Sequence, residues 1–354
     1  MELESLYQIY LANPHVVIDS REVQPNSIFF GFKGSNVDGN QFAHDALDKR
    51  ASLAVIDNSE VWAQLPNSYK DKTFFAENTL HALQGLAEHH RNQLDIPIIA
   101  LTGSNGKTTT KELLYSVLSQ QFNTFATPGN FNNHIGLPLS ILQISYSHEI
   151  AVLEFGANHL GEHSKLCKLA KPDYGLITNI GKDHLEGYGG WEGVMQAHQE
   201  FTDFLYGQKA HCFLNNDDET IKSIAKLLST STYGKTTHDS LDCAGYINAL
   251  FPFLSIMVEK NLSNSGSSFK IDTHLFGDFH FYNLMAAVCT GQYFGISNSR
   301  IKEALASYVP ANNRSELIEK GNNKIILDAY NANPSSMQKA LENFDKLDAK
   351  HKIA

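Results

Sequence analysis

Short apolar runs alternate with amphipathic stretches along most of this chain. Apolar residues at helical spacing mark four stretches as helices, at 41–49, 79–93, 282–294 and 299–308. The runs that we expect to form strands are 16–18, 27–32, 53–56, 98–102, 149–155, 174–179 and 210–214. Strands that alternate with helices in this way are typical of a mostly parallel sheet covered by helices. The pattern therefore predicts an α/β fold.

The alternation falls into three parts. We expect a small α/β domain at residues 1–94, a central domain at 95–311 and the start of a third domain at 312–354. Near the end of the central part, the apolar run 249–259, the polar turn 261–268 and the run 269–276 predict a hairpin.

The third part is short. After a linker at 310–313 it offers a strand at 324–328, a helix at 335–347 and, at 352–354, the opening of a further strand. One strand and one helix cannot enclose a core of their own. We therefore expect the sequence to be truncated inside its last domain.

The most distinctive stretch is Thr102-Gly103-Ser104-Asn105-Gly106-Lys107-Thr108-Thr109-Thr110, between the apolar run 98–101 and a helical pattern at 111–118. Glycines allow a tight turn whose backbone N–H groups, with the helix N-terminus, can surround a phosphate. Lys107 would add a charge for the terminal phosphates and Thr108 a hydroxyl for Mg²⁺. The motif is the shorter G-x-x-G-K-T, so an ordinary glycine turn with a surface lysine is the alternative. The order of strand, turn, Lys-Thr and helix favours ATP binding.

Composition narrows the class of protein. Of the 354 residues, 42% are hydrophobic and 19% charged, which is typical of globular domains. The net charge is −10 without a Lys/Arg cluster, so we expect no nucleic-acid partner. The longest apolar stretch, 249–258, is too short to span a bilayer, and the N-terminus does not resemble a secretory signal. We expect a cytoplasmic monomer without membrane contact, whose scattered cysteines are buried thiols, namely Cys167, Cys212, Cys243 and Cys289.

Polar residues that follow other apolar runs are further candidates. Glu154 lies at the end of a strand, where ligands bind in parallel sheets, and could hold Mg²⁺; a solvated carboxylate is the alternative. His184, in the glycine-rich stretch 178–189, could ligate a metal or contact phosphates, although a lone histidine usually does neither. Asn132 and Asn133 could bind a polar substrate or simply form a turn.

Together these blocks resemble the Mur ligases, the ATP-dependent amide-forming enzymes of bacterial peptidoglycan synthesis. The blocks are T-G-S-N-G-K-T-T-T-K (102–111), P-G-N-F-N-N-H-I-G-L-P-L (128–139), E-F-G-A-N-H (154–159), T-N-I-G-K-D-H-L-E-G-Y-G (178–189), G-D-F-H-F-Y-N-L-M-A-A (277–287) and D-A-Y-N-A-N-P-S-S-M (328–337). The last block, with 19–34 and 38–43, is similar to the branch of the family that adds D-alanyl-D-alanine. The likeness runs from about residue 16 to the final residue.

The resemblance implies three domains: a small N-terminal α/β domain for the UDP-sugar, a central P-loop ATPase domain with a parallel sheet, and a Rossmann-like C-terminal domain that is incomplete here. It implies a ligase that uses ATP and Mg²⁺ to activate the tripeptide carboxylate of UDP-N-acetylmuramoyl-tripeptide as an acyl phosphate. The amine of D-alanyl-D-alanine would then attack and expel phosphate. Such an enzyme serves cell-wall biogenesis and, through it, cell shape and division.

The resemblance also assigns roles to residues. Lys107, Glu154, His184 and His198 fall at catalytic positions, and of these Glu154 would bind one Mg²⁺ with Thr108 while His184 serves a second metal position. The UDP moiety is expected at Ser20, Arg21, Asp38 and Gly39, and the sugar-peptide arm beside Asn132 and Asn133. ATP is expected at Gly103, Ser104, Asn105, Gly106, Lys107, Thr108, Thr109, Asn283 (adenine), Arg314 and Asp328.

One position departs from the family pattern. The family usually has a lysine in the helix after the His-Leu-Glu-Gly loop, modified by CO₂ to a carbamate that helps to hold the second Mg²⁺. Here His198 stands at that position, and no lysine lies between Lys182 and Lys209. Histidine cannot form the carbamate, and Mg²⁺ prefers oxygen ligands. Either Glu200 or a water substitutes, or catalysis is weakened, or the register is shifted.

Two other functions are left open. A sister Mur ligase that adds one amino acid, or a folylpolyglutamate-type ligase, belongs to the same class of enzyme. A nucleotide-binding pseudoenzyme belongs to another class, and His198 and the incomplete last domain suggest it. For the 354-residue chain we expect weak nucleotide binding and no product, because Arg314 and Asp328 would lie on an incomplete domain.

Overall fold

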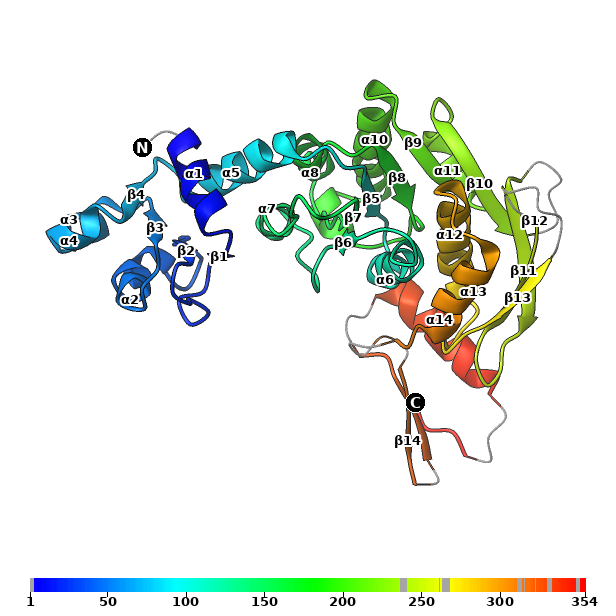
Figure 1. Cartoon of the computed structure of the whole chain (residues 1–354). Coiled ribbons are helices and arrows are strands. Elements are labelled where there is room, and N and C mark those ends of the chain that lie inside the picture. Colours follow the sequence, from blue (N-terminus) through cyan, green and yellow to red (C-terminus); the bar gives the residue numbers. More distant parts are fainter. Residues whose placement is uncertain are drawn as a thin grey trace. The chain divides into compact units, whose positions relative to one another are not determined.

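The computed structural model describes residues 3–235, 241–260, 262, 268–310, 314, 316–321, 323–329, 333–347 and 351–354. The chain divides into two compact units (Figure 1), and neither is one continuous stretch of sequence. The first unit comprises Met1–Asp95, Phe131–Tyr146 and Leu169–Lys171, and the second comprises Ile96–Asn130, Ser147–Lys168 and Pro172–Ala354. Residues 131–146 and 169–171, which we expected in the central domain, are thus counted with the N-terminal part, while the division into three domains stays a prediction.

The first unit is built on a four-stranded parallel sheet. Its strands, in spatial order, are β1 (Val16–Val17), β2 (Ile28–Phe30), β3 (Leu53–Ile56) and β4 (Thr73–Phe75). The strands expected at 16–18, 27–32 and 53–56 and the helix expected at 79–93 are confirmed, whereas β4 was not predicted. The helices of this unit are α1 (Leu3–Ala12), η1 (Gly39–Phe42), α2 (Ala43–Asp48), α3 (Ser59–Gln64), α4 (Asn67–Lys70), α5 (Thr79–Gln93) and α7 (Gly136–Ile141).

Hydrogen bonds hold the separate segments of this unit together. Tyr10 Oη donates to the Leu142 carbonyl at 2.6 Å, and His90 Nε2 bonds to the Ile144 carbonyl at 2.7 Å. The guanidinium of Arg91 donates to the carbonyls of Ala170, Lys171 and Leu94 at 2.7, 3.0 and 2.9 Å. Residues distant in sequence therefore complete the surroundings of α1 and α5.

The second unit is built on a nine-stranded sheet in the order β13-β12-β11-β10-β9-β8-β5-β7-β6. Pairing is parallel from β6 to β11 and antiparallel for β12 and β13. Its strands are β5 (Ile98–Thr102), β6 (Thr124–Ala126), β7 (Ile150–Glu154), β8 (Tyr174–Ile177), β9 (His211–Asn215), β10 (Ser229–Lys235), β11 (Cys243–Ala249), β12 (Ser255–Lys260) and β13 (Phe269–Asp272).

The sheet corrects the expected hairpin in one respect. Strands β12 and β13 do pair antiparallel, but the first strand begins at Ser255 and not at 249. Pro252 lies in the stretch before β12, and proline cannot donate a hydrogen bond to a neighbouring strand. The turn expected between the two strands lies mostly outside the described residues.

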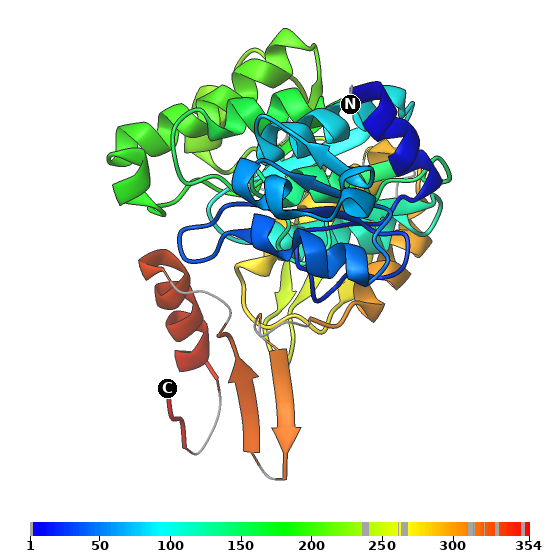
Figure 2. The same cartoon turned by 90° about the vertical axis from the view of Figure 1, so that its left-hand side faces the viewer.

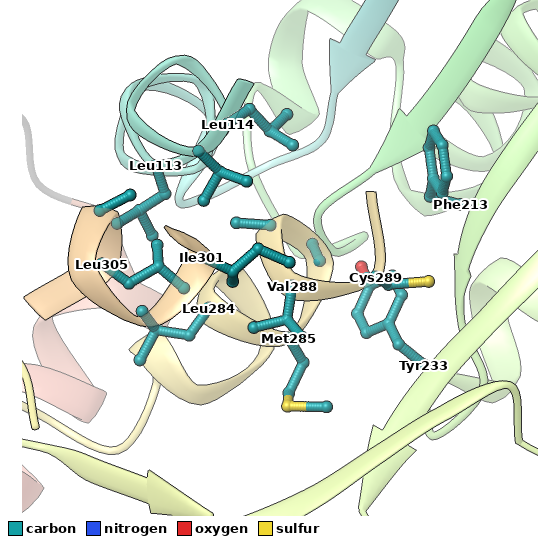
Figure 3. Packing of buried hydrophobic residues seen from close by; sticks show 14 of the residues in the cluster. Leu113, Leu114, Phe213, Tyr233, Leu284, Met285, Val288, Cys289, Ile301 and Leu305 are labelled. Carbon is teal, nitrogen blue, oxygen red and sulfur yellow. The ribbon is translucent and has the colours of Figure 1, made fainter. Parts of the chain in front are cut away.

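Helices α6, α12 and α13 pack their apolar faces against one another (Figure 3). Leu113 and Leu114 of α6 and Leu284 and Val288 of α12 are fully buried in this core. A Cβ on Gly291 would lie 2.5 Å from Val117 Cγ1, so the glycine permits the close approach of α12 to α6. The helices of this unit are α6 (Lys107–Leu118), α8 (Glu162–Ala170, whose last two residues are counted with the first unit), α9 (Leu185–Tyr188), α10 (Trp191–Gly207), α11 (Glu219–Ile224), α12 (His280–Tyr293) and α13 (Asn298–Ser307).

The segment after residue 313 adds a separate antiparallel pair, β14 (Glu316–Lys320) and β15 (Asn323–Leu327), and the helix α14 (Pro334–Asp345), as Figure 2 shows. Asn333 caps α14, because its side chain accepts from Ser336 N while the Ser336 hydroxyl bonds back to Asn333 N. The expected strand and helix are confirmed here, but the strand expected at 352–354 is wrong. Residues 351–354 have no regular structure, since no neighbouring strand pairs with them.

Two expectations from composition can be compared with the structure. All four cysteines are buried and free, as predicted. Within the described ranges, no helix has both the length and the apolar character that crossing a membrane demands.

Candidate nucleotide site

The glycine turn lies between β5 and the N-terminus of α6, at the carboxyl edge of the parallel sheet. Gly103 has φ +132° and Gly106, which caps α6, has φ +78°. A Cβ on Gly103 would lie 2.2 Å from Thr178 Oγ1, and one on Gly106 would lie 3.0 Å from Asn283 Oδ1. Both positions therefore favour glycine through their backbone angles, and Gly103 also requires it for space.

A second loop, after β8, braces this turn. Asn179 accepts from Ser104 N with its carbonyl at 2.9 Å and from Asn105 N with its side chain at 3.1 Å. Ser104 Oγ donates to Asp183 Oδ1 at 2.7 Å, and Thr178 Oγ1 donates to the Asn105 carbonyl at 2.7 Å. The second loop thus fixes the turn at the N-terminus of α6, and a helix N-terminus is a favourable place for an anion.

Lys107 begins α6 with its ammonium group over the turn. Its Nζ donates to the carbonyls of Gly103 at 2.5 Å and Ser104 at 3.2 Å. Burial lowers the pKa of Lys107; the negative charges of Glu154 and Asp183 act in the opposite direction, and the positive charge of Arg314 lowers it further. The ammonium group is therefore held over the turn by two of the turn's own carbonyls.

Glu154, at the end of β7, meets the first turn of α6. Thr108 Oγ1 donates to Glu154 Oε1 at 3.3 Å, and Lys111 Nζ lies 3.8 Å from Glu154 Oε2. Glu154 N donates to Thr127 Oγ1 at 2.9 Å, which holds the end of β7 to the residues after β6. A hydroxyl and a carboxylate oxygen thus converge, and these are donors that Mg²⁺ prefers, so this position fits the expected Mg²⁺.

The second metal position fits less well. His184 is exposed at the N-cap of α9 with φ +47°, and the described residues contain no group of three His, Cys, Asp or Glu side chains that could share a metal ion. His198, on α10, is buried, and a hydrogen bond joins its Nδ1 to the Val194 carbonyl at 2.9 Å. Burial lowers the pKa of His198, which favours the neutral imidazole. The chemistry of these two histidines therefore does not match an oxygen-lined Mg²⁺ site.

Glu200, one of the expected substitutes for the carbamate, binds backbone donors. Its Oε1 accepts from Gly161 N at 2.7 Å, and its Oε2 accepts from Ser164 N at 3.3 Å. Both oxygens therefore satisfy backbone donors around the N-terminus of α8, where a negative charge is favourable.

His163 binds Thr102, the residue just before the glycine turn. Its Nε2 and Thr102 Oγ1 are hydrogen-bonded at 2.8 Å, and its ring lies 5.2 Å from that of His198. Burial lowers the pKa of His163 to about 3, and the nearby His198 and Lys107 act in the same direction. This residue was not predicted from the sequence.

The other residues expected at ATP differ in how closely they contact the turn. Asn283, on α12, packs against Gly106, and a hydrogen bond of 3.2 Å joins its Nδ2 to His280 Nδ1. Arg314 is close enough for its charge to lower the pKa values of Lys107 and Lys111. Asp328 is exposed after β15. Asn333, which was not predicted, donates from Nδ2 to Asn105 Oδ1 at 2.7 Å and brings the N-terminus of α14 to the turn.

In the first unit, the residues expected at UDP form two small hydrogen-bonded groups. The Ser20 carbonyl accepts from Lys49 Nζ at 2.9 Å, and Arg21 forms an ion pair with Asp19. Burial acts to raise the pKa of Asp38, but hydrogen bonds from Asn40 and Asn58 outweigh it and lower the pKa. A Cβ on Gly39 would lie 2.6 Å from the Phe32 carbonyl oxygen, so this turn requires a glycine.

The amide pair expected at the sugar-peptide arm includes a turn former. Asn133 Oδ1 accepts from Ile135 N at 3.1 Å and from Gly136 N at 2.9 Å, which fixes the start of α7. Asn132, beside it, is half-buried.

A glycine turn with Lys107, Thr108 and Glu154 at the carboxyl edge of a parallel sheet defines an α/β nucleotide-binding protein. Comparison with known families makes this specific: the chain belongs to the Mur ligase family. Residues 101–291 match the Mur ligase middle domain, and residues 14–91 match the domain described as "Mur ligase family, catalytic domain". The members of this family are ATP-dependent amide-bond ligases.

Within the family the chain is similar to MurF. It is 34% identical over 355 residues to the UDP-N-acetylmuramoyl-tripeptide--D-alanyl-D-alanine ligase of Bacillus subtilis, and the match covers 96% of this chain and 73% of that protein. MurF of Thermotoga maritima, solved in complex with ADP, superposes with a TM-score of 0.82 at 29% identity, covering 96% of this chain and 76% of that one. MurF of Acinetobacter baumannii gives a TM-score of 0.82 at 28% identity, with coverage of 96% and 76%. The chain therefore spans about three quarters of the length of these relatives.

Proposed function

We propose that this chain acts in the ATP-dependent joining of D-alanyl-D-alanine to the tripeptide carboxylate of UDP-N-acetylmuramoyl-tripeptide. The observation that carries the proposal is the convergence of Lys107, Thr108 and Glu154 at the braced glycine turn. It is supported by the 34% identity to a relative that bears this activity in its name. The setting would be the cytoplasm, during peptidoglycan precursor synthesis.

The chemistry needs two steps. In the first, a carboxylate oxygen attacks the terminal phosphorus of ATP, and ADP leaves as an acyl phosphate forms. In the second, the amine nitrogen of D-alanyl-D-alanine attacks the carbonyl carbon and loses a proton to solvent, and phosphate leaves from the tetrahedral intermediate. Lys107 would neutralise the negative charge that spreads over the transferring phosphoryl group, and the N-terminus of α6 would stabilise the phosphates from the other side.

Magnesium would be held by the Thr108 hydroxyl and the Glu154 carboxylate. When bound, the ion would supply further positive charge to the phosphate oxygens. Asn283 would contact adenine, Arg314 and Asp328 would contact the nucleotide, and His184 would act near the phosphates. Ser20, Arg21, Asp38 and Gly39 would bind the UDP moiety, with Asn132 and Asn133 at the sugar-peptide arm.

A coupled assay of phosphate release tests the proposal. It measures phosphate release by this chain in the presence of ATP and Mg²⁺. Any release should require both the UDP-linked tripeptide and D-alanyl-D-alanine; glycine, L-alanine and D-glutamate serve as control amines. A carboxylate labelled with ¹⁸O should pass one label to the released phosphate. Release that is supported better by a single amino acid would instead favour a sister ligase.

A second candidate, nucleotide binding without turnover, is favoured by the buried, neutral His198 at the place of the family's lysine. It predicts that the protein binds ATP and UDP-sugar but releases no phosphate with any amine. The sharp comparison is His198→Lys assayed with bicarbonate. A much higher rate for His198→Lys than for the natural chain would identify the histidine as the defect. A natural chain that already releases phosphate, at a rate that the substitution leaves unchanged, would exclude the pseudoenzyme.

A further inference from the structure

Lys111 is a buried lysine that the nucleotide chemistry described above does not use. It lies on α6 one turn after Lys107, and its side chain is only 4% exposed. Its Nζ donates to the Gly129 carbonyl at 2.9 Å and lies 3.8 Å from Glu154 Oε2. Burying an ammonium group is unfavourable unless it is paired, so these two acceptors explain why the side chain is tolerated there.

Helical spacing places Lys111 beside the metal candidate. Residues 107, 108 and 111 fall on one stripe of α6, because positions three and four apart lie on the same face. Along this stripe Thr108 bonds to one oxygen of Glu154, and Lys111 lies beside the other. The carboxylate, itself 2% exposed on its side chain, therefore already has a positive charge from the protein at one side.

The same two residues hold the chain after β6. Lys111 binds the carbonyl of Gly129, and Glu154 N bonds to Thr127 Oγ1 at 2.9 Å. Residues 127–130 are thus tied at two points to the pair formed by Lys111 and Glu154. The other charges that act on Lys111 are the carboxylate of Glu112 and the guanidinium of Arg314.

We propose that Lys111 is a positioning residue that acts as an internal counter-ion. It holds Glu154 and residues 127–130 in place before a divalent cation arrives, and its charge weakens the hold of Glu154 on that cation. The inference rests on the proposed function in so far as the cation accompanies a nucleotide at Thr108 and Glu154. It adds a residue that sets the affinity for the metal without touching the reacting atoms.

Linkage between nucleotide and metal binding tests this role. The dissociation constant of ADP is measured by calorimetry with EDTA and again with saturating Mg²⁺. The value in EDTA divided by the value in Mg²⁺ gives the gain in affinity due to the metal, and this ratio is compared between variants. Lys111→Met should raise this ratio by about tenfold, near the lower end of what a unit charge at about 4 Å is worth. Lys111→Arg, which keeps the charge, should stay within about twofold of the natural chain. An unchanged or smaller ratio in a folded Lys111→Met protein would overturn the proposal.

A thermal unfolding cycle covers the case in which Lys111→Met does not fold. Lys111→Met and Glu154→Gln should each lower Tm, and the double variant should regain a large part of the loss, because neither charge is then left unpaired. Losses that simply add would count against the counter-ion role. Both experiments use ADP or no ligand at all, so a failure of the ligation assay would sink the proposed function without deciding this inference.

Discussion

The glycine turn at 103–106 and the helix α14 both approach the nucleotide site, but they are held in opposite ways. The turn is enclosed by Thr178 and Asn179, which leave no room for a Cβ at Gly103, and by Asn283, which makes a tight contact at Gly106. Helix α14 instead docks through polar contacts, namely Asn333 to Asn105 at 2.7 Å, Asn343 to Asp278 at 3.0 Å and Lys346 to Asp278 at 3.2 Å. Its Met337 and Leu341 are 44% and 48% exposed.

This difference separates a preformed part of the site from an adjustable one. Of these contacts only Lys346 to Asp278 is exposed, and Asn343 is buried. We still expect undocking α14 to cost less free energy than moving the turn, because a few hydrogen bonds hold the helix whereas buried neighbours pack against the turn. Phosphate recognition should therefore depend on steric fit around the turn, and the contribution of α14 should depend on a few hydrogen bonds. Three predictions test this contrast.

The largest effect is expected from Gly103→Ala. The new Cβ would lie 2.2 Å from Thr178 Oγ1 and 2.9 Å from the Asn179 carbonyl oxygen, at a φ of +132°. We expect a loss of about 3 kcal/mol in the free energy of unfolding, from strain and overpacking together, and no measurable ADP binding. Denaturant unfolding and calorimetry measure the two effects.

Gly129→Ala is the matched control. Gly129 also has a positive φ, +50°, but nothing lies within 4 Å of its Cβ position. It should lose only about 1 kcal/mol, from the backbone conformation alone. Equal losses at the two glycines would mean that the turn is not sterically enclosed.

A smaller effect on the free energy of unfolding is expected when the pH is lowered. Burial lowers the pKa values of His163 and His280 to about 3 each, and these residues support Thr102 and Asn283 beside the turn. Below a pH of about 6.5 the unfolded chain takes up a proton at each histidine while the folded chain does not, so stability falls as the pH drops from about 6.5 towards 3. The slope should be about 1 kcal/mol per pH unit for each histidine.

Unfolding curves between pH 7 and pH 4.5 check this prediction. His163→Asn should show a shallower dependence on pH than the natural chain. A natural chain whose stability is flat over this window would contradict the buried, neutral state of both residues.

The smallest effect is expected at Asn333. Asn333→Ala removes both the cap of α14 and the bond to Asn105, and amide hydrogen exchange in 334–345 should accelerate by about fivefold, the value of one cap. Asn333→Ser keeps a capping hydroxyl but is too short for Asn105, so it separates the two roles. Neither variant should change global unfolding. A global loss above about 1 kcal/mol would show that α14 is integral to the core.

What could be predicted from sequence was local. The strand 98–102, the turn and the helix that follows lie within about twenty residues, so apolar spacing and two glycines were enough to predict them. Strand β10 was missed because its residues, Ser229–Lys235, are mostly polar, and β6 because it has only three residues. Both strands depend on pairing with neighbours that are distant in sequence.

The partners of the turn were beyond sequence reasoning for the same reason. Ser104 and Asp183 are 79 positions apart, and nothing in either block indicates that they bond. Lys111 did carry a signal, since a charged residue four places after Lys107 lies on the same helix stripe. Its partner could not be predicted, because only the folded chain places Glu154, at the end of β7, beside Lys111.

The discontinuous make-up of the first unit bears on any attempt to produce it alone. The backbone passes from one unit to the other five times, after residues 95, 130, 146, 168 and 171. A gene fragment that ends at residue 95 would leave Tyr10, His90 and Arg91 facing solvent in place of the carbonyls of Leu142, Ile144 and Ala170. The isolated fragment 1–95 should therefore be poorly soluble. A stable version of the first unit would need residues 131–146 and 169–171 joined to it by engineered loops.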